Sequence, residues 1–569
     1  MTSKTSAIAG AAALVLLVHA LARADGDADP CTYLFDTGKT SATAIAAADL
    51  GAKAGWKRLE EDDTTHRFLG DSVLVNDRLA VVLRRGGAAA EVYGRTGNRF
   101  VYRLSIGPTA GAKTAALAGI KIVENGPAAV MAEASFGPPD GKTMAMSYRL
   151  TTGQAAVQLR PKPAELAVEV GCAAQYALVP DFFGDDLIVG AEAAGTRTPI
   201  PAENFFLGLL GQGNALVMCV WKSPQRVATA AVATQDGRRA ISGWSIQPGP
   251  AGSNADLWIA ILEGAGIWHT TPISGKQAEG ELAVDWKPPF AAKWRAAIQR
   301  PAGIAQSWYL RQSEEEQISS TTKTCPCTVG EQGSRLSLGA LAAGGAAQRP
   351  LIVYPIDRTR ATPLTTLCPI DILRATLGVG PCQYILQTEG LASESNPTPD
   401  AVMTWVEKQF SKKKQKKAAD DIGRLLDEMT AHMGHAETRL QQYAALARDV
   451  RTACGAAAGS EQFAQLARLV DYLDESLAPV SAASKPSQQA AKLAQQVVAL
   501  VDRKDSALEC QRLGRELRRL GAIQDTALAR CRLAARCLKV YAAAIAAGEP
   551  GAEQAHRICR RAAEVLKSP

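Results

Sequence analysis

The sequence predicts an α+β protein with segregated domains, in which an N-terminal antiparallel β-sandwich region precedes a C-terminal all-α helical bundle. Up to about residue 390, short segments of alternating apolar and polar residues recur between Gly, Pro, Asn and Asp, which is typical of antiparallel sheets. Beyond residue 399 the apolar residues repeat with the period of a helix instead. The first part shows no strand-helix-strand rhythm, which argues against a parallel nucleotide-binding sheet.

Composition limits the classes of protein that need to be considered. The chain has 569 residues, of which 47% are hydrophobic and 21% charged, so it is ordinary globular material. At about 150 residues per domain, two to four domains are expected. The 63 Lys and Arg exceed the 56 Asp and Glu by only seven. A dedicated nucleic-acid-binding protein is usually more basic, so we expect no nucleic acid partner.

The N-terminus has the pattern of a secretory signal peptide over residues 1–24. Lys4 supplies a positive charge, residues 8–18 form an apolar run, and Ala22-Arg23-Ala24 offers small residues before a cleavage site. The run is shorter than the roughly 20 residues that span a bilayer, although an uncleaved anchor is the alternative. No later stretch is long and apolar enough to span one. We therefore expect a secreted or periplasmic protein without an integral membrane span after cleavage.

The β region is expected over residues 25–390, as one domain or two subdomains. Residues 73–83 read as two strands around a turn at Asn76-Asp77, because both turn residues tolerate the left-handed conformation of tight hairpins. Residues 143–150 alternate Met, Tyr and Leu with Thr, Ala, Ser and Arg, which predicts a half-buried strand. A linker is expected over residues 391–415 and the helical bundle over residues 416–569.

A heptad pattern identifies the first long helix of the bundle. From Ile422 to Cys454 apolar residues recur at alternating steps of four and three, which is the seam of a helix that packs on a partner. Partner helices are predicted over residues 460–473, 488–501, 505–520, 522–547 and 551–566. Gly521 and Gly548 are expected to end two of them.

Export changes the interpretation of the twelve cysteines, because disulfides form in oxidising compartments. If the chain turns at Gly521, Cys510 and Cys531 lie almost equally far from the turn and face each other. The same argument at the next turn pairs Cys537 with Cys559. We therefore predict the disulfides Cys510–Cys531 and Cys537–Cys559, the alternative being reduced cysteines in the core.

Familiar catalytic motifs are absent from the sequence. It contains no Walker A loop, no G-x-S-x-G elbow and no G-x-G-x-x-G, so we expect no cofactor and no metal. Loop carboxylates flanked by aromatic residues are the best catalytic candidates, since glycoside hydrolysis uses paired carboxylates and a histidine can serve as a base. The candidate catalytic residues are Asp181, Asp185, Asp186, Glu203 and His269.

Aromatic and arginine side chains supply candidates for substrate binding. Seven of the nine tryptophans lie within 88 residues, and Trp244 and Trp268 among them could stack on sugars or simply fill the core. Asp357, Arg358 and Arg360 are expected in a loop bounded by prolines. Such arginines could clamp an anionic group, or form a structural pair with the aspartate.

Residues 68–83, followed by Gly86-Gly87, carry a resemblance to a known family. Their strand pattern resembles the opening strands of galactose-mutarotase-like β-supersandwich proteins, which recur among secreted carbohydrate-active proteins. The resemblance extends over about residues 66–300. It implies a supersandwich fold and a carbohydrate ligand, and it carries no catalytic residue to this chain.

The charge is unevenly distributed. Residues 400–569 hold 27 Lys and Arg against 20 Asp and Glu, with five lysines within residues 412–417. Such a run could bind an acidic polysaccharide or a phosphate-rich envelope surface, or it could be a solvated turn.

Together these observations predict an exported carbohydrate-active or carbohydrate-binding protein, with a polysaccharide or envelope glycan as partner. If it is an enzyme, a polysaccharide hydrolase or lyase is expected. The alternative is a noncatalytic cell-envelope scaffold or interaction protein that engages a protein partner through its helical domain.

Overall fold

The structure is a computed structural model in which two compact units can be distinguished. It describes residues 31–109, 116–137, 144–180, 185–191, 196–222, 227–235, 238–247, 256–274, 280–299, 303–312, 324–338, 348–358, 398–457, 461–548 and 552–567. Unit 1 comprises residues 1–168 with 256–261, and unit 2 comprises residues 169–255 with 262–569. The predicted signal peptide, Asp181 and Arg360 lie outside the described residues.

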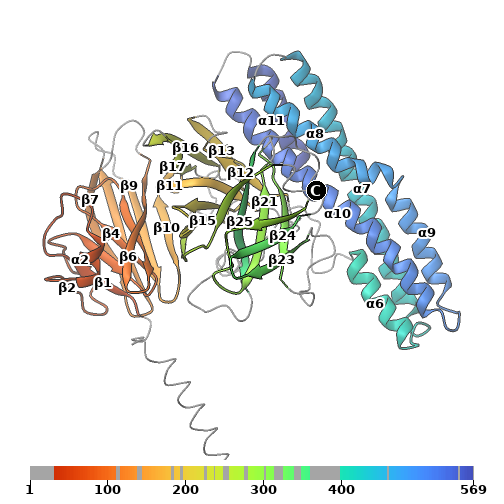
Figure 1. The fold of residues 1–569 in the computed structure, drawn as a ribbon, viewed down its shortest axis with the longest axis horizontal. Helices are drawn as coiled ribbons and strands as arrows, with labels where there is room; N and C mark the ends of the chain where they lie inside the picture. The colour runs from red at the N-terminus through yellow and green to blue at the C-terminus, as the bar shows by residue number, and fades with distance from the viewer. Residues whose placement is uncertain are drawn as a thin grey trace, which may run out of the picture. The chain divides into compact units, whose positions relative to one another are not determined.

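Unit 1 is built from two antiparallel meanders and one short helix (Figure 1). The first meander pairs its strands in the order β2-β1-β3-β4-β5-β6. Its elements are β1 (Tyr33–Asp36), α2 (Ala47–Ala52), β2 (Lys57–Arg58), β3 (Ser72–Val75), β4 (Leu79–Leu83), β5 (Ala90–Thr96) and β6 (Arg99–Pro108). The second pairs β7 (Ala116–Asn125), β8 (Ala129–Gly137), β9 (Met144–Thr151), β10 (Ala156–Lys162) and β18 (Leu257–Glu263) in that order.

The predicted hairpin of residues 73–83 is confirmed as β3 and β4. Asn76 closes its turn, because the side-chain oxygen accepts hydrogen bonds from the backbone of Arg78 and Leu79 at 2.8 and 2.7 Å. All five residues of β4 are buried, which is the pattern of a strand covered on both faces. The predicted alternating strand of residues 143–150 is confirmed as β9.

Unit 2 begins with further antiparallel strands. One group pairs in the order β12-β11-β14-β15, and β13, β16 and β17 form another. These strands are β11 (Val168–Val179), β12 (Leu187–Gly190), β13 (Arg197–Ile200), β14 (Phe205–Leu210), β15 (Ala215–Trp221), β16 (Ala228–Gln235) and β17 (Arg238–Ile246).

A separate seven-stranded sheet follows in the order β19-β25-β21-β22-β23-β24-β20. It consists of β19 (His269–Ile273), β20 (Glu281–Val284), β21 (Ala292–Ile298), β22 (Gln306–Arg311), β23 (Thr324–Gly330), β24 (Gly333–Ser337) and β25 (Arg349–Arg358). Trp286, Trp294 and Trp308 fill its core.

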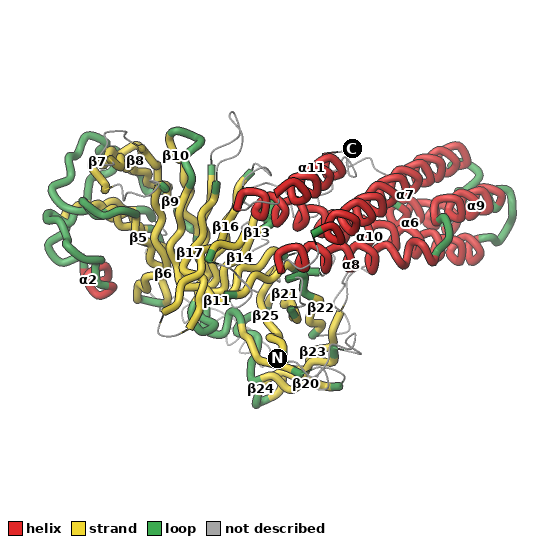
Figure 2. Tube along the Cα trace, turned by 90° about the horizontal axis from the view of Figure 1, so that it is seen from above, coloured by secondary structure: helices red, strands yellow, loops and turns green. Residues whose placement is uncertain are grey.

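The rest of unit 2 is a helical bundle (Figure 2). Its helices are α6 (Pro399–Ser411), α7 (Ala419–Ala456), α8 (Glu461–Ala482), α9 (Pro486–Ala499), α10 (Ala507–Gly548) and α11 (Ala552–Lys567). The apolar positions of the predicted heptad are buried along α7, and the segregated β and α regions confirm the predicted fold class. Among the helices that the structure describes, none is both long and apolar enough to cross a membrane.

Two expectations about the helical region are wrong. Residues 399–411, assigned to a linker, form α6, which starts with Thr398 capping the backbone N–H of Ala401 and with Pro399 in the first turn. Gly521 does not end a helix, because α10 runs unbroken from Ala507 to Gly548. A side-chain carbon at Gly521 would lie 2.6 Å from Cγ of Pro399. The glycine therefore serves the close approach of α6 to α10.

The continuous helix also overturns one predicted disulfide. Cys510 and Cys531 lie 21 residues apart within α10, and at 1.5 Å per residue their backbones are separated by roughly 30 Å. A disulfide cannot span that distance. Cys537 and Cys559 lie on α10 and α11, which form a helical hairpin as expected. Both are free thiols in the structure, so their pairing stays a prediction.

We predict that Gly521→Ala destabilises the bundle. The new methyl group must displace Pro399, and such overpacking costs about 1–3 kcal/mol, more than the roughly 1 kcal/mol that alanine adds as a helix former. Gly434→Ala in α7 is the matched control, because its methyl group would meet nothing within 4 Å. The control is expected to raise the melting temperature in far-UV circular dichroism, whereas Gly521→Ala lowers it. Equal stabilisation by both substitutions would contradict the contact.

Candidate functional site

Two of the candidate carboxylates of unit 2, Glu203 and Asp185, are held by arginines of α10. Glu203 follows β13, and its Oε1 lies 2.9 Å from Arg532 and 2.7 Å from Arg536. Arg536 also donates hydrogen bonds to the carbonyls of Pro201 and Ala202. Because Arg532 and Arg536 are four residues apart, they share one face of the helix, and together they bind the segment that carries Glu203.

Burial and charge act in opposite directions on Glu203. Burial raises the pKa of its carboxyl group, but the positive charges of Arg536 and Arg532 outweigh this effect, and the net pKa is lowered. The side chains of all three residues are at most 15% exposed. Glu203 is therefore held in its ionised form.

Asp185 and Asp186 point to different partners. Asp185 is buried and pairs with Arg530 of α10 at 2.5 Å. Asp186 is also buried, pairs with Arg295 of β21 at 2.5 Å, and accepts a hydrogen bond from the hydroxyl group of Tyr354 in β25. Asp185 thus contacts the bundle, whereas Asp186 contacts the seven-stranded sheet.

These buried ion pairs give the carboxylates a structural role, which was not among the expectations from the sequence. A carboxylate bound by arginine on the inside of a protein is a weak general acid, since its protonated form is disfavoured. His269 begins β19, and the charge that acts on it comes from Asp285, not from a predicted catalytic carboxylate. The catalytic assignment of these residues stays a prediction.

The two tryptophans proposed to bind substrate are core residues. Trp244 is fully buried, and its indole N–H lies 3.1 Å from the sulfur of Cys219. Trp268 is 2% exposed and donates to the carbonyls of Leu210 and Ala215. Neither ring is accessible to a sugar, so the expected stacking is wrong for both and the core alternative holds.

Asp357 and Arg358 end β25, where they pair in register with Lys293 and Ala292 of β21. They thus belong to a strand instead of the expected loop.

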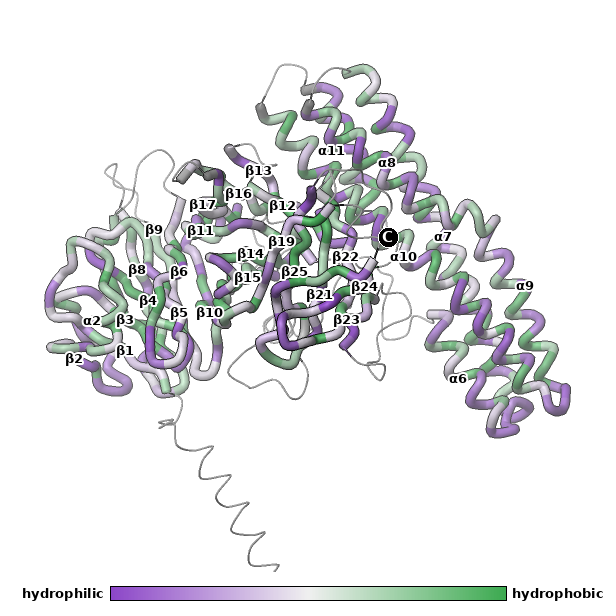
Figure 3. The backbone as a smooth tube through the Cα atoms, in the orientation of Figure 1, coloured by the Kyte–Doolittle hydropathy of each residue, from purple (hydrophilic) through white to green (hydrophobic). Residues whose placement is uncertain are grey.

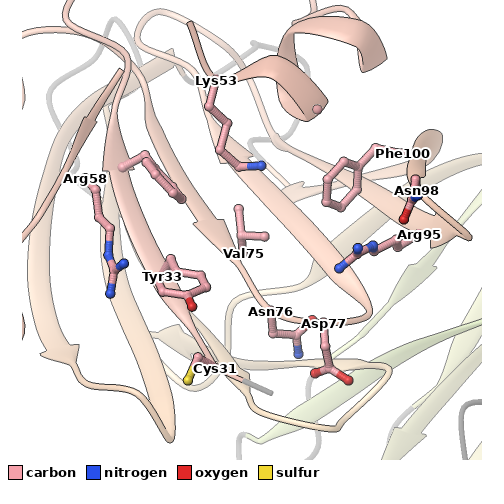
Figure 4. A pocket seen from close by; sticks show the side chains of 12 residues that line it. Cys31, Tyr33, Lys53, Arg58, Val75, Asn76, Asp77, Arg95, Asn98 and Phe100 are labelled. Atoms are coloured by element: carbon pink, nitrogen blue, oxygen red, sulfur yellow. The ribbon is translucent and has the colours of Figure 1, made fainter. Parts of the chain in front are cut away.

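A cavity of about 310 Å³ in unit 1 is the second candidate site (Figure 4). Its wall combines three aromatic rings, three cationic side chains and several polar groups. The lining residues are Cys31, Tyr33, Phe35, Gly51, Lys53, Arg58, Val75, Asn76, Asp77, Arg95, Asn98 and Phe100. Figure 4 shows Lys53 and Arg95 directing their charged ends towards the space beside Val75 and Phe100.

The first meander and the end of α2 bring the three cations together. Lys53 caps α2 with a left-handed backbone, φ 48°, and its ammonium group lies 5.7 Å from the ring centres of both Phe35 and Phe100. The guanidinium of Arg58 in β2 lies 4.2 Å from the ring centre of Tyr33 in β1. These cation–π contacts orient the charged groups before any ligand arrives.

The cations of the cavity repel one another. Burial lowers the pKa of Lys53, and the charge of Arg95 lowers it further. Within the described part of the chain, no carboxylate forms a salt bridge with Lys53, Arg58 or Arg95. The cavity therefore presents positive charge that an anion could neutralise.

The residues of this cavity form no local motif and therefore gave no signal in the sequence. Lys53, Arg58 and Arg95 are spread over more than 40 positions and three elements, so only strand pairing brings them together. For the ion pairs of Glu203, the four-residue spacing of Arg532 and Arg536 in an otherwise apolar helical segment was a usable signal.

Comparisons with known proteins found two glycoside hydrolases among similar structures. An alpha-N-acetylgalactosaminidase from Bifidobacterium bifidum has 11% identity and a TM-score of 0.19, and the match covers 37% of this chain and 35% of that protein. A glycoside hydrolase of family 81 from Clostridium thermocellum has 11% identity and a TM-score of 0.20 over 89% of this chain and 71% of that protein. Both TM-scores are too low to indicate a shared overall fold.

The resemblance of residues 66–300 to galactose-mutarotase-like proteins stays a prediction. No protein-family model and no curated protein matches the chain.

We predict that Glu203→Gln lowers the melting temperature, because Arg532 and Arg536 then face a neutral amide in a buried setting. Breaking such a pair costs about 3–5 kcal/mol. The exposed pair of Glu428 and Arg424 provides the control, and Glu428→Gln should leave the melting temperature nearly unchanged, because exposed ion pairs contribute little to stability.

The effect of Glu203→Gln should depend on pH. The pKa of Glu203 is lower in the folded protein than in the unfolded chain. The contribution of Glu203 to the free energy of unfolding is therefore complete above the unfolded-state pKa and is lost as the pH falls through the folded-state pKa. The melting curves of variant and parent should therefore converge in acid. A variant that melts like the parent at neutral pH would show that Glu203 is not needed for stability.

Proposed function

We propose that this protein is an exported carbohydrate-binding protein whose unit 1 cavity binds an anionic sugar residue of a polysaccharide. The observation that carries the proposal is the meeting of Lys53, Arg58 and Arg95 among aromatic rings, without a carboxylate partner among the described residues.

An anionic group explains why three cations can be tolerated in one cavity. Lys53 loses part of its hydration by burial and is repelled by Arg95, and both effects lower its pKa. The negative charge of a carboxylate between Lys53 and Arg95 would offset both effects on this pKa, because it favours the charged form of Lys53. Arginine also binds carboxylates through two parallel hydrogen bonds, which favours a planar acidic group over a diffuse charge.

A sugar suits the remaining groups of the wall. Tyr33, Phe35 and Phe100 offer apolar ring surface for the C–H groups of a pyranose, while Asn98 offers polar atoms for its hydroxyl groups. Asp77 already accepts from the backbone of Gly153 at 2.7 Å and pairs with Arg78 at 3.0 Å. Asn76 is occupied, because its side chain bonds to four backbone groups. The volume of about 310 Å³ lies at the lower end of small-ligand sites and suits one or two sugar residues.

The cavity favours binding over hydrolysis. Glycoside hydrolysis uses two carboxyl groups on either side of the scissile bond, and Asp77 is the single carboxylate among the described lining residues. Hydrolysis or elimination at Asp185 and Glu203 remains the second candidate, because both residues follow from the sequence pattern. Its test is the release of reducing ends from neutral and acidic polysaccharides.

We expect the protein to bind oligogalacturonate in isothermal titration calorimetry and to bind the corresponding neutral oligosaccharide at least tenfold more weakly. Arg95→Ala and Arg58→Ala should each weaken binding roughly tenfold or more, which is the scale of one hydrogen bond to a charged group. Lys121→Ala, which removes an exposed cation of β7, is the matched control and should bind normally.

Equal affinity for the acidic and neutral oligosaccharides would rule out the proposed role of the cations. Release of reducing ends that is lost in Glu203→Gln, with binding unaffected by Arg95→Ala, would instead support the hydrolase.

Binding should weaken at alkaline pH, and the pKa of Lys53 sets the pH at which the affinity begins to fall. The pKa of Lys53 is lowered in the protein without ligand, and a bound anion raises it. Above the pKa of the ligand-free protein, ligand binding is therefore coupled to the uptake of a proton by Lys53. Affinity should be constant below that pKa and fall as the pH rises through it. Lys53→Arg keeps its charge at these pH values, and its affinity should stay constant where that of the parent falls. An identical fall in both proteins would exclude Lys53 as the titrating group.

A further inference from the structure

Two loops form one end of the helical bundle in unit 2. Residues 412–418 join α6 to α7, and residues 500–506 join α9 to α10. Salt bridges from Lys413 to Asp505 at 3.9 Å and from Lys416 to Asp502 at 3.6 Å connect the loops. We call this pair of loops, together with the first turn of α10, the bundle tip. Figure 3 colours the loops at the ends of α6 and α9 as hydrophilic.

The bundle tip is strongly cationic. With the first turn of α10 it holds seven Lys and Arg against Asp502, Asp505 and Glu509, a net charge of +4, and Glu509 pairs with Arg503 at 3.3 Å. All seven cations are exposed, namely Lys412, Lys413, Lys414, Lys416, Lys417, Arg503 and Lys504. The two connecting salt bridges are more than 70% exposed at every side chain, so they offset little of the field that an approaching anion meets. Asp420 and Asp421 follow at the start of α7.

Exposed apolar side chains lie beside these charges. Leu508, in the first turn of α10, is 81% exposed, and Val498, near the end of α9, is 43% exposed. Complete burial of an exposed leucine side chain is favourable by about 1.5–3 kcal/mol of transfer free energy. An isolated exposed leucine needs no explanation, but here it directly follows a loop of exposed cations.

We propose that the bundle tip docks on an anionic phospholipid surface. Phosphate groups attract lysine and arginine near a bilayer, and an apolar side chain next to the cations can enter the interface between headgroups and acyl chains. A soluble polyanion would use the cations and leave Leu508 in water. This inference goes beyond the proposed carbohydrate binding, since it uses no residue of the unit 1 cavity.

The test is sedimentation of the full mature chain with vesicles of phosphatidylcholine, with and without about one-third phosphatidylglycerol. Binding is expected to the anionic vesicles alone and to decline with added sodium chloride, because salt screens exposed charges. Failure to bind anionic vesicles, or equal binding to both kinds, overturns the proposal.

Variants separate the tip from the overall charge. Lys412→Ser, Lys414→Ser and Lys417→Ser remove three exposed cations that have no salt-bridge partner among the described residues. Together they should weaken vesicle binding roughly a hundredfold, at about fivefold per cation. The matched control removes three positive charges elsewhere in the bundle by changing the exposed Arg448, Arg468 and Arg560 to serine. Equal losses in the two triple variants would overturn the role of the tip.

Leu508→Ser tests the choice of a lipid surface. It should weaken binding to anionic vesicles about tenfold and leave the melting temperature unchanged, since the side chain is 81% exposed. Two outcomes would show a polyanion site instead of a lipid site. One is unchanged vesicle binding by the Leu508→Ser variant. The other is competition by soluble polygalacturonate that is as strong for this variant as for the parent. Normal vesicle binding by Arg95→Ala would keep this result separate from the test of the cavity.

Discussion

The ion pairs between α10 and the segments beside β12 and β13 make the helical bundle and the neighbouring strands of unit 2 interdependent. Arg532 and Arg536 bind Glu203, and Arg530 binds Asp185. Removing such charges from water is costly, and their attraction offsets this only while both partners are in place. The pairs therefore act as a constraint on where the bundle lies against its strands. The same ion pairs engage Asp185 and Glu203, the carboxylates that the sequence pattern suggested as catalytic residues.

Unit 1 uses charge in the opposite way. Lys53 and Arg58 contact aromatic rings, and neither they nor Arg95 are neutralised by described carboxylates, so their positive field remains available to a ligand. The same residue types thus have different roles in the two units. An arginine that meets a buried carboxylate stabilises the fold, whereas an arginine whose charge faces a cavity can recognise an anion.

Periodic features were predicted well, because each depends on neighbours within a few residues. The heptad of α7, the hairpin of β3 and β4 and the alternation of β9 follow from which side chains share a face. Gly521 was misread, since glycine is common after helices but here accommodates Pro399 from another helix. For Trp244 and Trp268 the sequence left sugar stacking and core packing open, because burial depends on distant strands.

The sequence by itself was enough to predict the segregation of strands from helices and the strongly periodic elements, because hydrophobic period is a local property of the chain. Only the tertiary structure decided which charges meet. Arg532 and Glu203 are 329 residues apart, and Lys53, Arg58 and Arg95 reach one cavity from separate elements. Electrostatic partners are set by distances in space and by burial, and neither is encoded in the spacing of residues along the chain.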